Sequence, residues 1–407
     1  MEKENKKQLN IPKLHFLGFD KKWLCGEIKD IGEVIGGGTP DTTILDYWGG
    51  DINWFTPTEI KQKYISESSR KISKIGLNKS SAKLLPPGTL LLTTRATVGD
   101  VSISNLESST NQGFQSILVN KDNINEFFYY WILKNKNKFL KLANGSTFPE
   151  ISGKEVKKIK IIYPEREEQQ KIADFLSTID NWINNLKQQK ENLWSYKKGI
   201  MQKIFSQEIR FKDANGINFA EWEKKKLKNI AKIYDGTHQT PKYLKEGIPF
   251  YSVEHLTANN FNNTKFISRD IFEKENKKVK IEKNDILMTR IGDIGTARLI
   301  DWDVNASFYV SLALIKQSEK INSKYLSKYI SSISFKKELW KRTIHVAFPK
   351  KINLGEIGES NVLVPSIHEQ QKIADFLSSI DDLIELKENK INETENWKKG
   401  LMQQMFI

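Results

Sequence analysis

A long internal repeat limits, more than any other feature, how this chain can fold. Residues 168–180, Glu-Gln-Gln-Lys-Ile-Ala-Asp-Phe-Leu-Ser-Thr-Ile-Asp, return at 369–381 with one change, Thr178 to Ser379. Residues 196–205 return at 397–406 with the same offset, 201 positions along the chain. The 407-residue chain is therefore two copies of one unit, each a divergent globular part followed by a nearly identical tail.

The two tails have the pattern of long helices that pack on each other. In the first tail apolar residues recur at intervals of seven from Ile172 to Ile200, and the second tail keeps much of this stripe. A helix of about 40 residues would span about 60 Å. We expect the helices to pair antiparallel and to relate the globular parts by an approximate two-fold axis. The alternative is two unrelated helices within larger domains. The predicted seam residues are Ile172, Phe175, Ile179, Trp182, Ile373, Phe376, Ile380 and Leu383.

The whole pattern predicts an α/β protein with two domains in tandem repeat, joined by two long antiparallel coiled-coil helices. Short apolar runs that end in an arginine predict strands at 90–95 and 285–290, and amphipathic segments predict helices at 125–139 and 323–340. The predicted parts are an N-terminal arm (1–22), a first domain (23–164), a central helix (165–208), a second domain (209–365) and a C-terminal helix (366–407).

Basic composition points to a polyanionic partner. Lys and Arg number 64 against 50 Asp and Glu, a formal net charge of +14, so nucleic acid is the expected ligand. The alternative is a lysine-rich protein that does not bind DNA. Neither a secretory signal nor an apolar run long enough to cross a membrane is apparent, and we expect a cytoplasmic protein. The single cysteine, Cys25, excludes an internal disulfide and a cysteine-rich zinc site.

Matching loops in the two copies carry the candidate DNA contacts. Glycine-rich turns at 36–40 and 235–241 expose amides and hydroxyls, and each predicted strand ends in an arginine beside a glycine turn, Arg95 or Arg290. Such an arginine can contact guanine or phosphate; the alternative is a structural ion pair with Asp100 or Asp293. We expect Arg290→Ala to impair sequence recognition by the second copy.

Two further loops, 145–149 and 343–349, end in a shared Phe-Pro. His238 and His345 suit base contacts better than metal binding, because no other ligand stands at metal-binding spacing; ordinary surface histidines remain the alternative. The predicted DNA-binding residues are Thr39, Thr94, Arg95, Thr97, Ser146, Thr147, Thr237, His238, Gln239, Thr289, Arg290 and His345.

The tails, Glu-Gln-Gln-Lys-Ile-Ala-Asp-Phe-Leu-Ser followed by Lys-Lys-Gly-Ile/Leu-Met-Gln, and residues 235–241, Asp-Gly-Thr-His-Gln-Thr-Pro, resemble the specificity subunit of Type I restriction-modification systems. The resemblance covers essentially the whole chain. It implies two target-recognition domains that each read half of a bipartite DNA site, with the helices setting the spacer. The first domain departs from the pattern, because residues 36–40 lack the His-Gln of the second.

The resemblance also implies partners and a division of labour. Two methylation subunits would dock on the seam residues of the helices, and two restriction and motor subunits would join them. S-adenosylmethionine, ATP and Mg²⁺ would be used by those other subunits, so we expect no cofactor or metal bound directly to this chain and no catalysis by it alone.

Catalytic alternatives find little support in the sequence. The chain lacks both the Asn-Pro-Pro-aromatic loop of adenine methyltransferases and the spacing of a phosphate-binding P-loop. Asp41, Glu59 and Lys61 resemble the carboxylate and lysine pattern of metal-dependent nucleases, which is the alternative function. The second copy does not repeat the pattern. A transcription regulator would need a helix-turn-helix, and none is evident.

Overall fold

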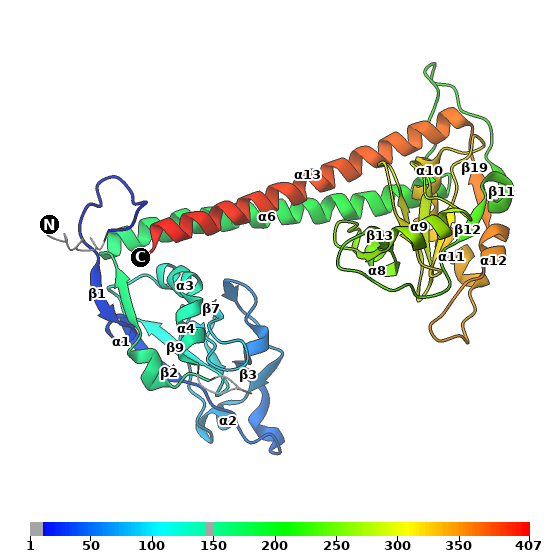
Figure 1. Ribbon diagram of the computed structural model, residues 1–407. Helices are drawn as coiled ribbons and strands as arrows, with labels where there is room; N and C mark the ends of the chain where they lie inside the picture. Colours follow the sequence, from blue (N-terminus) through cyan, green and yellow to red (C-terminus); the bar gives the residue numbers. More distant parts are fainter. Residues whose placement is uncertain (1–10, 144–149) are drawn as a thin grey trace. The chain divides into compact units, whose positions relative to one another are not determined.

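The computed structural model describes residues 11–143 and 150–407. The chain divides into two compact units: unit 1 is Met1–Leu186 with Lys390–Ile407, and unit 2 is Lys187–Asn389. Two long helices, α6 (Arg166–Phe205) and α13 (Ile367–Met405), each contribute one half to each unit (Figure 1). The helices predicted from the heptads therefore form, but they are divided between the units and do not make a compact part of their own.

Unit 1 is built on two sheets and a two-stranded ribbon. The larger sheet has the order β2-β9-β6-β7-β4, and the smaller has the order β5-β3-β8 with β3 parallel to β8. The ribbon pairs β1 with β10 and so joins the two ends of the globular part. The strands are β1 (Leu24–Glu27), β2 (Gly32–Gly36), β3 (Trp48–Phe55), β4 (Tyr64–Ile65), β5 (Arg70–Ile72), β6 (Leu90–Leu92), β7 (Val101–Ser104), β8 (Ser108–Thr110), β9 (Gln115–Val119) and β10 (Lys160–Tyr163).

Unit 2 repeats this topology. Its four-stranded sheet has the order β12-β18-β15-β16, its three-stranded sheet the order β14-β13-β17 with β13 parallel to β17, and its ribbon pairs β11 with β19. The duplication read from the tails thus extends through the divergent parts. The strands are β11 (Glu223–Lys226), β12 (Ile233–Asp235), β13 (Ile248–Tyr251), β14 (Lys265–Ile267), β15 (Ile286–Ile291), β16 (Asp293–Leu299), β17 (Ser307–Phe308), β18 (Leu312–Ile315) and β19 (Asn361–Val364).

Short helices cover the sheets, and both helices predicted as continuous are broken. The first breaks at Asn135, whose side chain donates to the carbonyl of Trp131 at 2.9 Å, and the second at Ser331–Ser332, where Ser332 caps the following helix. The helices are α1 (Ile28–Ile31), α2 (Lys74–Asn78), α3 (Asn125–Lys134), α4 (Lys136–Leu142), α5 (Gly153–Lys157), α7 (Leu227–Ile230), α8 (Val253–Ala258), α9 (Arg269–Asn276), α10 (Ser323–Ile330), α11 (Ile333–Arg342) and α12 (Leu354–Glu359), with 3₁₀ turns at Leu45–Tyr47 and Pro57–Glu59.

Each unit has a core that combines its sheet, the start of one long helix and the end of the other. In unit 1, Phe406 packs against Trp23 and Phe127, with ring centroids 6.5 and 5.2 Å away. In unit 2, Phe205 packs in the same way against Tyr325 and Tyr329, at 6.0 and 5.2 Å. Within each unit the two helix segments run antiparallel, as predicted; in unit 1 the red last turns of α13 lie beside the green first turns of α6 (Figure 1). None of the helices in the described part of the chain is long and apolar enough to cross a membrane.

Candidate nucleic-acid interface

Identical contacts join the long helices to the globular part in each unit. The indole of Trp23 donates to Glu168 at 3.2 Å, and that of Trp222 donates to Glu369 at 3.0 Å. The side-chain amide of Gln169 donates to the carbonyl of Pro164, as that of Gln370 does to Pro365. Each unit therefore holds its sheet on the helices through the same buried polar bonds, which fix position in a setting where unpaired groups are costly.

A second matched set is ionic. In unit 1 Lys398 pairs with Asp180, and in unit 2 Lys197 pairs with Asp381, which also receives Lys328 at 2.5 Å. Burial raises the pKa of Asp381, but the two lysines outweigh it and hold the pKa below its ordinary value. The pairs Lys398–Asp180 and Lys197–Asp381 each connect the two helix segments of one unit, whereas Lys328 reaches Asp381 from α10. The ionic link between the helix segments is therefore repeated in the two units.

In unit 1 the predicted loops meet at one end of the large sheet. Gly38 donates its amide to the carbonyl of Thr110 at 2.8 Å, and the Thr39 hydroxyl donates to Gln112 at 2.5 Å. The amide of Thr94, in the turn after β6, donates to the carbonyl of Gly113 at 2.7 Å, and the Thr97 hydroxyl of the same turn donates to the carbonyl of Pro57 at 3.4 Å. The glycine turn, the turn after β6 and the 111–113 turn before β9 therefore form one surface.

Arg95 lies exposed on this surface. It pairs with Glu150, not with Asp100, at 2.6 Å, and both side chains are about half exposed. Asp100 pairs instead with Lys136. An exposed pair of this kind contributes little to stability, so Arg95 can exchange its partner for a base or phosphate at low cost. Ser146 and Thr147 lie outside the described residues.

In unit 2 the corresponding loops also meet. The Nε2 of His238 lies 2.7 Å from Asp235 Oδ2, and Thr240 shares a hydrogen bond of 3.1 Å with the hydroxyl of Tyr309. His238, Gln239 and His345 are exposed. The positions of these side chains allow contact with a ligand, and their role as DNA contacts stays a prediction, as it does for Thr39, Arg95 and Thr97.

Arg290 is the main correction among the predicted site residues. Its guanidinium is buried, donates to the carbonyls of Val310 at 2.9 Å and Ile352 at 3.0 Å, and lies 3.9 Å from Asp235, not on Asp293. Burial lowers the pKa of Arg290, which Asp235 partly opposes. The side chain joins three loops from inside the domain, an arrangement that disfavours a direct base contact. Three other predicted DNA-binding residues have buried side chains: Thr94, Thr237 and Thr289. Burial of these side chains disfavours direct base contact, and their role stays a prediction.

Two residues that the sequence did not single out lie on the same surfaces. Gln112 is exposed beside Thr39, and its amide has the paired donor and acceptor that read adenine. Tyr309 is its counterpart beside Thr240 and lines an open groove of about 430 Å³ with Tyr243, Phe250, Ser252, Val253, Glu254, Lys265 and Ser311. The polar turn Asn-Gln-Gly at 111–113 was the available signal for Gln112.

The nuclease pattern does not assemble into a metal site. Asp41 accepts from the amide and hydroxyl of Thr43, and Glu59 accepts from the amides of Thr56 and Ser69. Both carboxylates thus shape local turns. Among residues 11–143 and 150–407, no group of three or more His, Cys, Asp or Glu side chains is placed to hold a metal ion. Nothing in the geometry favours the alternative that uses Asp41, Glu59 and Lys61.

The predicted helix seam separates into a buried and an exposed set. Ile172, Ile179, Ile373 and Ile380 are buried in the two cores. Phe175 and Phe376 are partly buried at their edges. Trp182 and Leu383 are about half exposed. Of the predicted seam residues, Trp182 and Leu383 expose the most surface that a partner subunit could cover.

Comparison with known proteins places the whole chain in one group. The family model for the Type I restriction modification DNA specificity domain matches twice, at residues 20–193 and 220–396. The MjaIX specificity subunit of Methanocaldococcus jannaschii, from a Type I restriction enzyme, is 39% identical over 252 residues, which is 58% of each chain. The MjaVIII specificity subunit of the same organism is 28% identical over 421 residues, 97% of this chain and 95% of the relative.

Solved structures share the fold. The S subunit of a Type I restriction-modification system from M. genitalium superposes with a TM-score of 0.57 at 17% identity, covering 98% of this chain and 99% of that one. A chain from a study of complex assembly and conformational transition of the type I R-M system gives 0.59 at 14% identity, covering 94% and 97%.

Proposed function

Because the chain belongs to the family of Type I restriction modification DNA specificity domains, we propose that it reads a bipartite DNA sequence, one half with the loops of each unit. One observation carries the proposal. The contacts that hold each sheet on the helices are equivalent in the two units, whereas the loops that meet at the end of each sheet carry different exposed side chains. A shared frame with different reading loops suits two different half-sites.

The two surfaces offer different chemistry for this readout. Unit 1 presents Thr39, Arg95 and Gln112, and unit 2 presents His238, Thr240 and Tyr309. Arginine suits guanine and glutamine suits adenine in the major groove, where each base pair has its own pattern of donors and acceptors. The surplus of basic residues supplies the attraction to phosphate that does not depend on sequence.

The long helices would set the distance between the two half-sites and dock methylation subunits. Trp182 and Trp397 are about half exposed and lie 6.4 Å apart in unit 1. Their counterparts at the repeat offset, Leu383 and Tyr196, are about half exposed in unit 2. We call each pair a helix patch. Exposed apolar residues of this size mark protein interfaces, and two equivalent patches fit two copies of one partner.

The rest of the assembly follows the same division of labour. Two restriction and motor subunits would join the two methylation subunits. Catalysis, with S-adenosylmethionine, ATP and Mg²⁺, would take place on these other subunits, and this chain would select the site.

Substitution of Gln112 tests the reading surface. After co-expression with the methylation subunit, sequencing of methylated adenines gives the target. We expect Gln112→Ala to relax one base pair of one half-site by about 1–3 kcal/mol of discrimination and to leave the other half unchanged. Lys121→Ala, an exposed change just beyond the opposite end of β9, is the matched control. An equal loss of methylation on every target sequence would contradict base recognition by Gln112.

A further inference from the structure

One loop of unit 2 presents apolar side chains to solvent. Between α11 and α12, Val346 is 96% exposed and Phe348 is fully exposed. We call these two side chains the apolar tip. A folded chain normally covers much of a phenylalanine side chain, because burial of its apolar surface is favourable. Two exposed apolar side chains of this kind in one loop are typical of a surface that becomes buried when a partner binds.

The base of this loop is held firmly on the reading surface. The Gly292 amide donates to the carbonyl of Lys350 at 2.8 Å, and the Ile344 amide donates to the carbonyl of Lys351 at 2.8 Å. The amide of Ile352 donates to the carbonyl of Arg290 at 3.0 Å, while the Arg290 guanidinium donates back to Ile352. The buried arginine thus fastens the loop to the end of β15.

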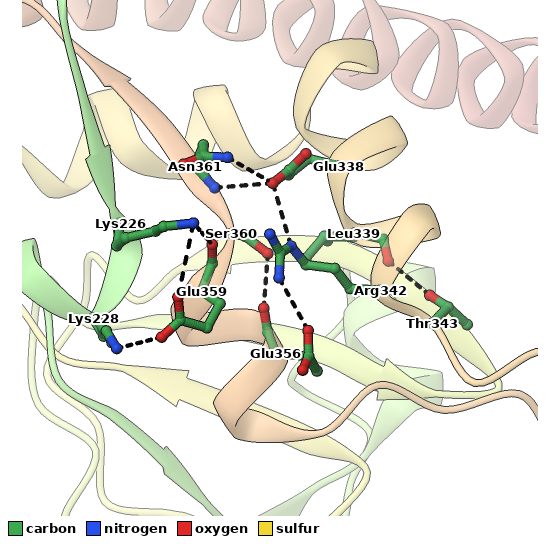
Figure 2. A network of polar contacts seen from close by, with 10 residues as sticks. All are labelled: Lys226, Lys228, Glu338, Leu339, Arg342, Thr343, Glu356, Glu359, Ser360 and Asn361. Carbon is green, nitrogen blue, oxygen red and sulfur yellow. Dashed lines mark hydrogen bonds and ion pairs between the residues drawn. The ribbon is translucent and has the colours of Figure 1, made fainter.

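A polar network fixes the other end of the loop (Figure 2). Arg342, the last residue of α11, contacts Glu338 at 3.3 Å and Glu356 at 3.0 Å, and Glu338 in turn accepts from the amide and side chain of Asn361. The hydroxyl of Thr343 donates to the carbonyl of Leu339 at 2.9 Å. The tip therefore projects from a base tied at both ends, so little loop ordering is needed when it is covered.

Positive charge surrounds the apolar tip. Residues 339–353 contain four basic residues, at 341, 342, 350 and 351, and no aspartate or glutamate. Arg342 is paired, but Lys341, Lys350 and Lys351 are exposed and form no ion pair with any of the described residues. Lys350 lies over the ring of Trp340, 4.6 Å from its centroid, and His345 packs on the same ring at 4.3 Å.

A partner that complements this surface would place anionic groups on the lysines and an apolar region on the apolar tip. The DNA duplex has this arrangement, with phosphates along its edge and stacked bases within. Lysine is depleted in protein–protein interfaces, whereas three exposed lysines without an ion pair to any described residue lie beside this tip. Charge complementarity therefore selects DNA over a protein surface.

We propose that Phe348 enters the base stack of the half-site read by unit 2 and opens one base step, with Val346 beside it and the lysines on the flanking phosphates. Proteins that insert apolar side chains between bases bend or unstack the duplex in this way, and steps that open easily are favoured. The inference rests on the proposed function and extends it: unit 2 would read the deformability of a step as well as base edges.

Fluorescence of 2-aminopurine tests the insertion, because its emission rises when the base loses its stacking neighbours. The probe is the duplex with the methylation-mapped target, bound to the chain assembled with its methylation subunits. 2-Aminopurine replaces in turn each adenine in and beside the unit 2 half-site, on either strand, except the methylated adenine, which the methylation subunit itself unstacks. We expect a rise at one step with the unmodified chain, a similar rise with Phe348→Leu, and none with Phe348→Ala. Affinity of Phe348→Ala should fall about tenfold, as expected for the loss of one base-stacking contact.

A second duplex tests the cause of the loss. This duplex has an abasic position at the step that Phe348 is proposed to open. Because no base has to be unstacked there, Phe348→Ala should bind it within about threefold of the unmodified chain. Because the side chain is fully exposed, the substitution leaves the core intact, and unchanged thermal unfolding verifies this.

Several results would overturn the insertion. One is specific binding by the unmodified chain without a rise at any step. A second is loss of affinity on replacing thymine by uracil, still with no rise, which would assign Phe348 to a thymine methyl group. A third is loss of methylation subunits from the Phe348→Ala complex with DNA affinity unchanged, which would assign the tip to a protein. Failure of the proposed function itself is distinct, because the unmodified complex would then not distinguish its target from a scrambled duplex.

Discussion

Arg95 and Arg290 occupy corresponding places at the ends of two strands, yet their surroundings give them different tasks. Arg95 is about half exposed and forms one ion pair, with Glu150. Arg290 is buried and donates hydrogen bonds to two backbone carbonyls. The sequence shows the same Thr-Arg pair before a glycine turn in both copies. It could not show the difference, because the groups that enclose Arg290 come from residues 310 and 352, far along the chain.

Alanine substitution should separate the two roles. Arg290→Ala leaves two buried carbonyls without donors, each costing about 1–3 kcal/mol, so we expect a fall of roughly 2–4 kcal/mol in the free energy of unfolding of unit 2. Arg95→Ala should change stability by about 1 kcal/mol or less and weaken recognition of the unit 1 half-site. Denaturant unfolding and methylation of half-site variants give the two readouts. A stable Arg290→Ala protein with altered base preference would contradict this assignment.

At the scale of elements, periodic patterns were the best guide. The heptads correctly predicted both long helices, and the short apolar runs correctly predicted strands that lead to Arg95 and Arg290. The breaks at Asn135 and Ser332 escaped prediction because polar residues there cap and turn the chain without interrupting the apolar spacing. The heptads also placed Trp182 in the buried seam, although it lies at its exposed edge.

The ionic contact between the two helix segments of unit 2 should make that unit sensitive to acid. Because the folded-state pKa of Asp381 lies below its unfolded value, the ionised carboxylate stabilises the fold above about pH 4, and the gain is lost as the pH falls through the folded-state pKa. Asp381→Asn should cost roughly 1–3 kcal/mol at pH 7, less than a fully buried pair, and flatten the loss of stability in acid.

Urea unfolding between about pH 2.5 and pH 7 measures this dependence around the ordinary aspartate pKa. Asp382→Asn is the matched control, since Asp382 is exposed and next in the chain. Equal acid sensitivity in the unmodified chain and Asp381→Asn would show that the pair contributes nothing.

The helix patches predict a stepwise loss of partners. Trp182→Glu places a charge in the unit 1 patch, where desolvation on docking is unfavourable, so the assembled complex should contain one methylation subunit fewer. Leu383→Glu should remove the other, and the double variant both. Native mass measurement counts the subunits, and Gln188→Glu, exposed on α6 outside the patches, is the control. Full assembly by the double variant would place docking elsewhere.

At the scale of the whole molecule, each unit is completed by chain from the other copy of the repeat. Met402, Met405 and Phe406 belong to the core of unit 1, although most of that core comes from the first 186 residues. Their counterparts Ile204 and Phe205 belong to the core of unit 2. The sequence showed the equal tails but not which end of each tail enters which core, because both cores offer aromatic residues at matching positions.

Phe406→Ala should therefore destabilise the N-terminal domain. Removal of a buried phenylalanine costs about 3–5 kcal/mol, so we expect faster amide hydrogen exchange in residues 23–164 and little change in residues 223–364. Gln404→Ala, exposed in the same turn, is the control. Equal acceleration in both units would mean that the chain unfolds as one cooperative body.

This exchange of helix ends has a consequence for synthesis. Domains usually fold in order of emergence from the ribosome, the N-terminal one first. Here the first domain lacks part of its core until Phe406 has been translated, whereas the second domain already has Phe205 when its own sheet emerges. The domain made first is thus the one that finishes folding last, and ribosome-bound intermediates stalled before position 402 should expose the aromatic surface around Trp23 and Phe127 to chaperones.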